Sequence, residues 1–291
     1  MSEVEEVVAV LDEAMSELAA KRPYSKGLID AFGPVIRAKR RLLVTLTFPE
    51  TPLTPVDVAK FEAGVPLLRQ QSPFLAEDPW QDIADGLIPA FQEGLLGLRQ
   101  DLELIRVRLA SGDIQLFDAI RDYPAIAVPI AAWSSQCVVQ PAAIELLLSL
   151  TAQVVLAKRA AAVAPFLSGL DWGKGYCPVC GAFPMLAFIR QKGQRWLHCA
   201  VCAHEWRFAR VTCPYCEYNG QAGTTCFFVD EAKDEYAVTC EQCHRYLLTV
   251  KREEVIAPAD SEITAIGLAH LDLMMQERGF QPMARCVWNQ F

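Results

Sequence analysis

The 291-residue sequence contains no cysteine among its first 136 residues and shows none of the common catalytic patterns. No pair of carboxylates and no nucleophile–base arrangement stands out. The glycine-containing stretches "GKGYC" and "GLLG" match neither a phosphate-binding loop nor a dinucleotide-binding fingerprint. These absences argue against an enzyme, and we expect the protein to have no turnover of its own.

Signals for export and for membrane insertion are also missing. The amino-terminal stretch "MSEVEEVVAVLDEAMSELAAKR" is acidic and amphipathic, without a basic start, an apolar centre or a twin arginine. The most apolar run, residues 146–157, has only twelve residues, whereas a helix that spans a bilayer needs about 20. We therefore expect a cytoplasmic protein with no membrane partner.

An excess of positive charge is missing too. The chain carries 27 Lys and Arg against 35 Asp and Glu, a formal net charge of −8, which argues against nucleic acid as the partner of the whole protein. Global disorder is excluded by the 52% of apolar residues, which can form a sizeable core. At this length the chain can form two domains of ordinary size.

Helical periodicity dominates residues 1–168, the part that we predict to be a helical domain. Pro34 and Pro55 suit the first position of a helix, Pro89 is expected to break or kink one, and Gly112 to end one. The last helix is apolar on nearly all sides, which indicates a central place in a bundle. The expected helices are residues 3–21, 34–46, 55–65, 78–112 (as one or two helices) and 140–167.

The composition changes at residues 168–177, where three glycines form a loop and the cysteine pairs begin. Short strands are expected after this loop, because β-branched and aromatic residues occur there in short runs separated by turn residues. The expected strands are two hairpins, 185–190 with 194–199 and 224–230 with 235–240, and a further strand at 245–251. A closing helix is expected at 259–280, with Gly279 at its end.

Eight of the eleven cysteines lie in four Cys-x-x-Cys pairs. Thiols stay reduced in the cytoplasm, so these pairs are not a disulfide framework, and their spacing favours metal binding over unrelated thiols. Cys137, Cys226 and Cys286 lie outside the pairs and are expected to pack as ordinary residues. The pairs are Cys177/Cys180, Cys199/Cys202, Cys213/Cys216 and Cys240/Cys243.

Two metal ions per chain are predicted from these pairs. One tight turn offers two sulfurs to an ion, and two such turns complete a tetrahedral site. A predicted hairpin separates the first pair from the second and the third from the fourth, so we expect sequential pairing; interleaved pairing, as in cross-brace domains, is the alternative. A structural staple, an electron-carrying iron site and a thiol–disulfide exchange site are all compatible with the pattern. His198, His204 and His244 flank the turns; we expect them to support the ligands or to lie at the surface, and metal ligation by them is the alternative.

Three stretches of the cysteine half resemble the formate dehydrogenase accessory proteins of the FdhE family. They are "CPVCGAFP" (177–184), "RWLHCAVCAHEWRFARVTCPYCE" (195–217) and "CEQCHRYL" (240–247). Trp206 and Arg210 occupy the family's Trp and Arg positions after the second pair. The chain departs from the ideal turn at Ala203, Glu217 and His244, because only the first pair is followed by glycine. We expect these three positions to need a positive φ.

The patterns and the resemblance together predict an α+β fold. It consists of a mainly helical domain at 1–168, two small rubredoxin-like or zinc-ribbon β modules at 172–212 and 213–255, and a closing helix at 259–280. The resemblance implies that one ion is held by Cys177, Cys180, Cys199 and Cys202, and the other by Cys213, Cys216, Cys240 and Cys243. It favours iron as the ion, with zinc as the alternative.

The resemblance also implies an accessory factor that is needed for active formate dehydrogenase and binds the catalytic subunit in the cytoplasm before export. Basic side chains gather around the first module, and between residues 171 and 252 they outnumber acidic ones by ten to eight. We expect Arg195, Trp206, Arg207 and Arg210 to be exposed and to contact the partner, because Arg and Trp are favoured at interfaces. The alternative for Trp206 is that it packs under the cysteine turn. A homodimer is left open. The alternative functions are a rubredoxin-like electron carrier and a zinc-ribbon nucleic-acid-binding protein.

Overall fold

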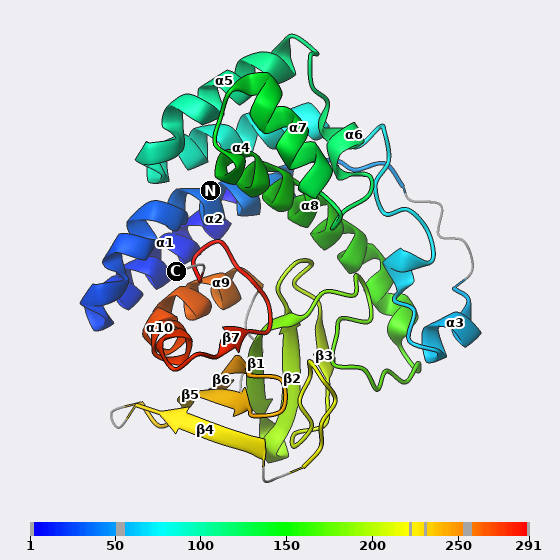
Figure 1. Cartoon of the computed structure of the whole chain (residues 1–291), viewed down its shortest axis with the longest axis vertical. Coiled ribbons are helices and arrows are strands. Elements are labelled where there is room, and N and C mark those ends of the chain that lie inside the picture. Colours follow the sequence, from blue (N-terminus) through cyan, green and yellow to red (C-terminus); the bar gives the residue numbers. More distant parts are fainter. Residues whose placement is uncertain (1–2, 51–55, 221–222, 230–231, 253–257, 290–291) are drawn as a thin grey trace. The chain divides into compact units, whose positions relative to one another are not determined.

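The computed structural model describes residues 3–50, 56–220, 223–229, 232–252 and 258–289, and it has the α+β fold that the sequence predicts (Figure 1). The chain forms two compact units. The helical unit consists of Met1–Pro52 and Ser72–Arg159, and the sheet unit consists of Leu53–Gln71 and Ala160–Phe291. Residues 56–71 therefore belong to the same unit as the paired cysteines, although the helical periodicity of residues 1–168 predicted them in the helical domain.

The helices of the helical unit bury the apolar stripes that their sequences predict. Helix α2 packs against α1 and α4, and Phe32, Ile83 and Phe91 are buried in this core. The helices are α1 (Glu3–Lys21), α2 (Lys26–Thr45), α4 (Trp80–Gly94), α5 (Arg99–Ala110), α6 (Leu116–Ile120), α7 (Ala127–Cys137) and the first part of α8 (Pro141–Val163).

Helix α2 begins at Lys26 and has Pro34 in its interior, so the helix start predicted at Pro34 was wrong. A proline inside a helix costs about 3 kcal/mol, because it removes one backbone hydrogen bond and crowds the preceding turn. Ile29 and Phe32 are buried on the amino-terminal side of Pro34 and continue the apolar stripe of Val35. The burial of these side chains offsets the cost of the proline.

The stretch 78–112 forms two helices, α4 and α5, but the break lies after Gly94 and not at Pro89, which stays inside α4. Helix α4 ends where it approaches α2 very closely. A Cβ atom at position 94 would lie 1.9 Å from the carbonyl oxygen of Ala31, so only glycine fits there. Gly112 follows α5 with a φ of 78°, as predicted for a helix stop.

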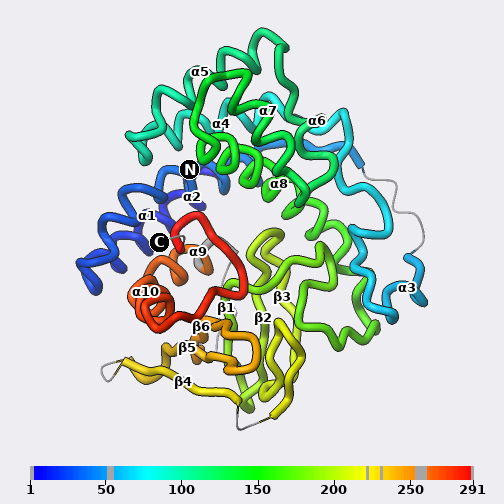
Figure 2. Tube along the Cα trace, viewed as in Figure 1, coloured from blue at the N-terminus to red at the C-terminus, as the bar shows by residue number. Residues whose placement is uncertain are grey.

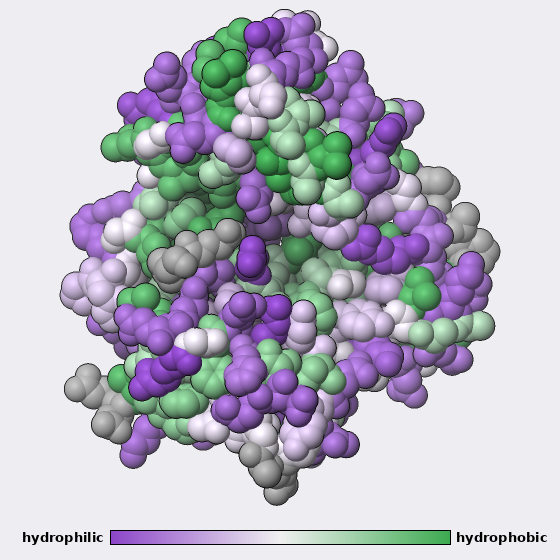
Figure 3. Space-filling view, in the orientation of Figure 1, coloured by the Kyte–Doolittle hydropathy of each residue, from purple (hydrophilic) through white to green (hydrophobic). Residues whose placement is uncertain are grey.

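Helix α8 is the apolar helix predicted at 140–167. By length and composition alone Pro141–Leu167 could cross a membrane, but 61% of its apolar window is buried inside the protein, as in the core helix of a folded unit. Arg159, near its end, forms a buried ion pair with Asp78. On the face shown in Figure 3, hydrophobic and hydrophilic side chains are interspersed over the helical unit.

One sheet forms the centre of the sheet unit (Figure 1). Its strands are β1 (Pro184–Arg190), β2 (Gln194–Cys199), β3 (Glu205–Arg207), β4 (Thr224–Phe228), β5 (Glu235–Cys240), β6 (Arg245–Lys251) and β7 (Gln281–Pro282). They follow the order β3-β2-β1-β6-β5-β4, with β7 beside β6. Both predicted hairpins are confirmed, because β1 pairs with β2 and β4 pairs with β5 in antiparallel orientation.

The two cysteine modules share this sheet. Strand β1 of the first module pairs in parallel with β6 of the second, with Leu186 opposite Leu248 and Phe188 opposite Val250. Figure 2 shows the two strands side by side, although they are far apart in the sequence. All four of these side chains are buried, so the pairing gives the sheet unit a larger core than either hairpin has by itself.

Two helices pack against the sheet where one was predicted. Helix α9 (Pro258–Gly267) contacts β1, and helix α10 (Ala269–Glu277) contacts β5 and β6. The closing helix expected at 259–280 is thus interrupted at Leu268. Gly279 follows α10 with a φ of 84°, which suits its expected place at the helix end.

Residues 56–71 hold the loop of the first cysteine pair through the backbone. The N–H groups of Leu67 and Leu68 donate to the carbonyls of Pro178 and Val179 at 2.9 and 2.8 Å. This segment contains the short helix α3 (Val58–Glu62), which has Asp57 as its amino-terminal cap. The helix start predicted at Pro55 lies outside the described residues.

Val138, directly after α7, carries backbone strain. Its φ is 57° and its side chain is 83% exposed, so a β-branched residue adopts the left-handed conformation without packing to stabilise it. We predict that Val138→Gly raises the free energy of unfolding of the helical unit by about 1 kcal/mol, because glycine adopts this conformation without a steric cost. Hydrogen exchange of the α8 amides in urea measures the change.

Val107→Gly is the matched control for this prediction. Val107 is also exposed, but it lies inside α5. Glycine is unfavourable inside a helix, so this change should lower the same free energy by about 0.5 kcal/mol. Effects of the same sign in both variants would contradict the strain at Val138.

Asp272 gives the sheet unit a dependence on pH. Its carboxylate accepts a 2.6 Å hydrogen bond from Tyr246 of β6, and both side chains are buried. Burial raises the pKa of Asp272 from 3.8 to about 7, although the hydrogen bond from Tyr246 acts in the opposite direction. Between these two pH values the folded protein keeps a proton that the unfolded chain has released. The free energy of unfolding therefore falls as the pH rises through this window.

We predict that Asp272→Asn removes this slope, which amounts to about 4 kcal/mol over the whole window. Thermal unfolding from about pH 5.5 to about pH 8 measures the difference between variant and wild type. Tyr246→Phe is the matched variant, because loss of the hydrogen bond should raise the pKa of Asp272 further and extend the slope to higher pH. An unchanged slope in Asp272→Asn would show that another group is responsible.

Candidate metal centres

The four cysteine pairs occupy corresponding places in the two modules. The first pair of each module lies in a turn before the hairpin, and the second pair lies where the hairpin ends and the chain turns into the next strand. These pairs are Cys177/Cys180 and Cys199/Cys202 in the first module, and Cys213/Cys216 and Cys240/Cys243 in the second.

The same backbone geometry closes these turns. In the leading turns, Gly181 N–H donates to the Cys177 carbonyl and Glu217 N–H donates to the Cys213 carbonyl, both at 2.9 Å. The residue after the second cysteine has a positive φ in all four turns, which confirms the expectation from the sequence. The φ values are 81° at Gly181, 59° at Ala203 and Glu217, and 52° at His244. Three of these residues are not glycine, so the surrounding structure holds them at a cost of about 1 kcal/mol or more each.

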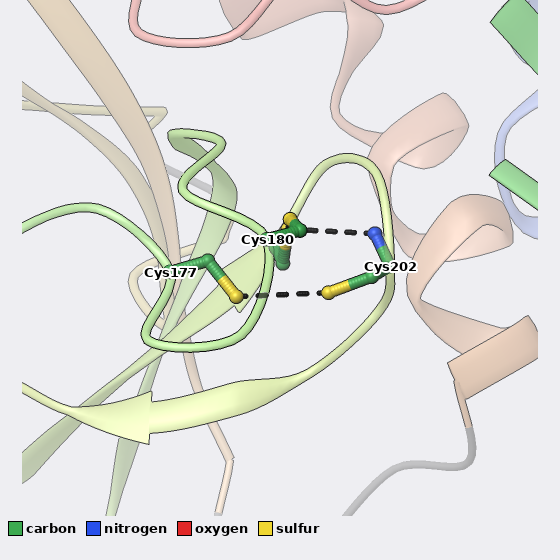
Figure 4. Close-up of side chains that lie close together, drawn as sticks. Cys177, Cys180 and Cys202 are labelled. Carbon is green, nitrogen blue, oxygen red and sulfur yellow. Dashed lines mark hydrogen bonds between the residues drawn. The ribbon is translucent and has the colours of Figure 1, made fainter. Parts of the chain in front are cut away.

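The eight thiols form two groups, each from the two pairs of one module. Within each group all four sulfur atoms lie within 4.8 Å of one another. In the first group Cys177 Sγ faces Cys202 Sγ at 3.6 Å (Figure 4), and Cys180 Sγ lies 3.4 Å from Cys199 Sγ. The grouping is therefore the sequential one and not the interleaved alternative.

These distances fit a tetrahedral metal ion. Four sulfurs at about 2.3 Å from one ion are about 3.8 Å from one another, whereas a disulfide joins two sulfurs at about 2.05 Å. In the second group the Cys213–Cys243 and Cys216–Cys240 sulfur pairs are both 3.7 Å apart, and the cysteines are free. Each group could thus hold one ion, two per chain, and the four-sulfur donor set suits iron and zinc alike.

Protons compete with a cation at these thiols. Burial raises the pKa of Cys177 and Cys202 well above that of a free thiol. Burial also acts on Cys199, but hydrogen bonds from the other three thiols of the group outweigh it and lower the pKa of Cys199. In the second group burial raises the pKa of Cys213 to about 11. A bound cation would replace these protons, so metal affinity should decrease as the pH falls.

The two groups differ in their access to solvent. All four cysteines of the first group are buried, whereas Cys216 is exposed and Cys243 partly exposed in the second. Protons, oxidants and chelators reach an exposed thiolate directly. The second group is therefore the more labile of the two candidate centres.

The three histidines suggested as alternative ligands belong to neither group, since both groups found among the described residues consist of cysteines. His198 is buried instead between β2, β3 and α9. Its Nδ1 atom lies 3.3 Å from Glu205 Oε1 and 3.4 Å from Ser261 Oγ. Polar partners of this kind position the turn that carries Cys199.

A groove of about 870 Å³ lies next to this turn in the sheet unit, and the four residues predicted to contact a partner all line it. Arg207 and Arg210 are exposed as predicted, but the exposure predicted for Arg195 and Trp206 was wrong. Arg195 stacks on Phe208, with the guanidinium 5.2 Å from the ring centroid. Trp206 packs inward, and its Nε1 donates to a backbone carbonyl at 3.2 Å.

Sequence reasoning missed the aromatic lining of this groove. Trp172, Trp196 and Phe208 line it together with the arginines. Trp172 owes its place to Phe61, whose ring centroid is 4.6 Å away. The two residues are far apart in the chain, and no local pattern indicates that they meet. The sequence indicated the aromatic lining only through the aromatic residues that lie close to Arg195, Arg207 and Arg210 in the chain.

Comparison with known proteins agrees with this architecture. Residues 176–210 match the family model described as "FdhE, central domain". "Protein FdhE homolog" from Aquifex aeolicus is 31% identical over 121 residues, which are 39% of this chain and 41% of the relative. "Protein FdhE" from Escherichia coli O1:K1 is 33% identical over 122 residues, which are 40% of this chain and 37% of the relative. The matched segment thus spans less than half the length of either relative.

A solved structure extends the likeness to nearly the whole chain. "The crystal structure of the FdhE protein from Pseudomonas aeruginosa" is 24% identical in sequence, with a TM-score of 0.64. The superposition covers 97% of this chain and 94% of the other. The two proteins therefore share their fold.

The fold and the two four-cysteine groups define a class of proteins in which a helical unit accompanies a sheet built from two metal-binding ribbon modules. The family model, the curated relatives and the solved structure agree with the motifs of the sequence. The cysteine region of this chain is therefore similar to the FdhE family, and the whole chain shares the fold of a solved FdhE protein.

We predict two metal ions per chain, of which the second group loses its ion first. Elemental analysis of anaerobically purified protein should give a value near two. On addition of a chelator such as EDTA, release should have a fast phase from the group with the exposed Cys216 and a slow phase from the buried group.

Cysteine variants assign the two phases. Each change removes one of the four ligands of one group. Cys216→Ser should therefore remove the fast phase and leave the slow one, and Cys199→Ser should remove the slow phase and leave the fast one. A single release rate for both ions, or a fast phase that persists in Cys216→Ser, would contradict the difference in access.

Proposed function

We propose that this protein is an accessory factor for the formation of active formate dehydrogenase and binds the catalytic subunit of that enzyme in the cytoplasm through its sheet unit. Similarity of the cysteine region to the FdhE family supports the role. The observation that carries the binding surface is the groove beside the first cysteine group, where Arg207 and Arg210 are exposed among aromatic side chains. Arginine and aromatic residues supply most of the binding energy at protein interfaces.

The chemistry of the cysteine groups favours a factor without turnover. Four sulfurs within 4.8 Å of one another fill the coordination sphere of a tetrahedral ion. Such a site has no open position at which a substrate or water could bind the ion. We therefore assign the ions the task of holding the sheet unit in shape, with iron favoured by the family resemblance and zinc as the alternative.

A rubredoxin-like electron carrier is the second candidate. The observation in its favour is the exposed Cys216, because a four-sulfur iron centre at the surface can exchange electrons with a partner. An absorption band that bleaches on reduction would be needed for this function. A carrier of this kind would also pass electrons to an acceptor at a rate that falls in Cys216→Ser.

The test of the proposed function has two parts. The purified chain with both ions should capture the catalytic subunit of formate dehydrogenase, and the chain alone should not oxidise formate. Cells that lack this protein should lose formate dehydrogenase activity, which the wild-type gene restores. Failure of capture in both redox states, together with normal activity in the deleted cells, would overturn the accessory function.

A further inference from the structure

The two cysteine modules are structural repeats, and their strands can be matched. Strands β1 and β2 correspond to β4 and β5, and β3 corresponds to β6, because each follows its second cysteine pair directly. The register is the same in both repeats. Cys199 N–H donates to the carbonyl of His204, and Cys240 lies opposite Arg245, which occupies the place of His204. Residues of β3 and β6 can therefore be compared one by one.

The repeats join head to tail, and within the part of the chain that the structure describes one edge of each repeat has no neighbouring strand. Strand β1 of the first repeat pairs with β6 of the second, while β3 and β4 end the sheet. A head-to-tail join always leaves one open surface at each end. Strand β3 thus corresponds to β6, and β6 pairs in parallel with β1 along the edge that β3 leaves open.

The groove lies where the missing strand would be. In the second repeat, the β6 residues opposite β1 are Leu248, Thr249, Val250 and Lys251. Their counterparts in the first repeat are Arg207, Phe208, Ala209 and Arg210, and all four line the groove. Strand β3 ends at Arg207, whereas β6 continues to Lys251, the counterpart of Arg210.

Backbone groups of β3 point toward this groove. In an antiparallel pair, alternate residues exchange hydrogen bonds with the neighbouring strand. At one end of β3 the Phe208 N–H donates to the Arg195 carbonyl of β2. At the other end the His204 carbonyl accepts a hydrogen bond from the Cys199 N–H of β2. By this alternation the N–H and C=O groups of Glu205 and Arg207 point away from β2. They are placed to pair with an added strand.

The charge of the groove indicates the chemistry of that strand. Arg207 and Arg210 are exposed. Arg195 is only 7% exposed, its Nε has no hydrogen-bond partner among the described residues, and its Nη2 donates to the carbonyls of Ala209 and Thr212. Three guanidinium groups are therefore gathered on a chain whose net charge is −8. Carboxylates are the partners that such a group favours.

The chain's own carboxylates balance this charge only in part. Asp171 and Glu205 line the groove, but Glu205 already accepts a 2.7 Å hydrogen bond from Arg190. In the second repeat the position of Arg207 is taken by Leu248, which faces Leu186. A strand that pairs with β3 would therefore meet Arg207 where β1 meets Leu248. We expect it to have acidic side chains at positions where β1 has apolar ones.

We infer that the groove along β3 binds an extended, acidic segment of the partner protein, which adds to the sheet as a strand parallel to β3. The inference rests on the proposed function, because it takes the partner to be the catalytic subunit of formate dehydrogenase. Acidic side chains of the segment pair with Arg207 and Arg210, and apolar side chains between them contact the aromatic lining.

A second copy of this chain is the other occupant to consider, because its open β4 edge is the counterpart of β1. Strand β4 has the sequence "TTCFF" and contains no acidic residue to meet the arginines. Pairing of β4 with β3 would also leave a new open edge and continue into a chain of copies. Charge therefore favours a different protein over a second copy.

Charge reversal in the full chain with both ions tests the surface. Arg207→Glu with Arg210→Glu should weaken binding of the purified catalytic subunit at least about tenfold, and Arg207→Lys with Arg210→Lys should retain most of it. Lys233→Glu with Arg252→Glu is the matched control, because both side chains are exposed in the same unit outside the groove. This control should bind as the wild type does.

Photo-crosslinking tests the occupant. Phe208→p-benzoylphenylalanine should crosslink to a segment of the subunit that is rich in Asp and Glu, and hydrogen exchange at the amides of Glu205 and Arg207 should slow on binding. Phe228→p-benzoylphenylalanine on β4 is the control position and should give no crosslink to the subunit. A synthetic peptide of the crosslinked segment should bind, and its Asn and Gln version should not.

The outcomes distinguish failure of the acidic-strand inference from failure of the proposed accessory function. Capture that persists unchanged after charge reversal would overturn the groove and leave the accessory function standing. Crosslinks from position 208 to a basic or helical surface, to nucleic acid or to a second copy of this chain would also overturn the acidic strand. Absence of capture by the wild type would remove the accessory function itself.

Discussion

The gathering of four thiols into one group, in a geometry that could hold a metal ion, is the constraint on which the sheet unit depends. The sulfur atoms within each group lie within 4.8 Å of one another, a distance that thiolates sustain only around a cation. Burial holds the thiols of the first group away from water. Residues such as Ala203 and Glu217 are kept at positive φ in the same turns. Without the ions these costs would have no compensation in so small a module.

Each cysteine group brings together the two ends of one hairpin, and the pairing of β1 with β6 joins the two repeats into one sheet. Because β1 pairs with β6 and not with a symmetric partner, the sheet has two unlike edges. One of these edges carries Arg207 and Arg210 beside an aromatic groove. The metal groups, the shared sheet and the proposed binding surface are therefore consequences of one arrangement.

The sequence predicted what depends on local spacing and missed what depends on distant contacts. Both hairpins, the grouping of the cysteines and the positive φ at Ala203, Glu217 and His244 follow from residues close together in the chain. The interior place of Pro34 depends on packing of α2 against other helices. The parallel pairing of β1 with β6 and the burial of Trp206 depend on segments that no local pattern connects.

The central claim is that metal-held geometry of the sheet unit creates the surface for the partner. Titration of the formate dehydrogenase catalytic subunit into three forms of this protein tests it most directly: with both ions, after chelation, and reloaded with zinc or with iron. The account predicts binding by the loaded forms, with either metal, and loss of binding after chelation. Equal binding by the metal-free protein would contradict it.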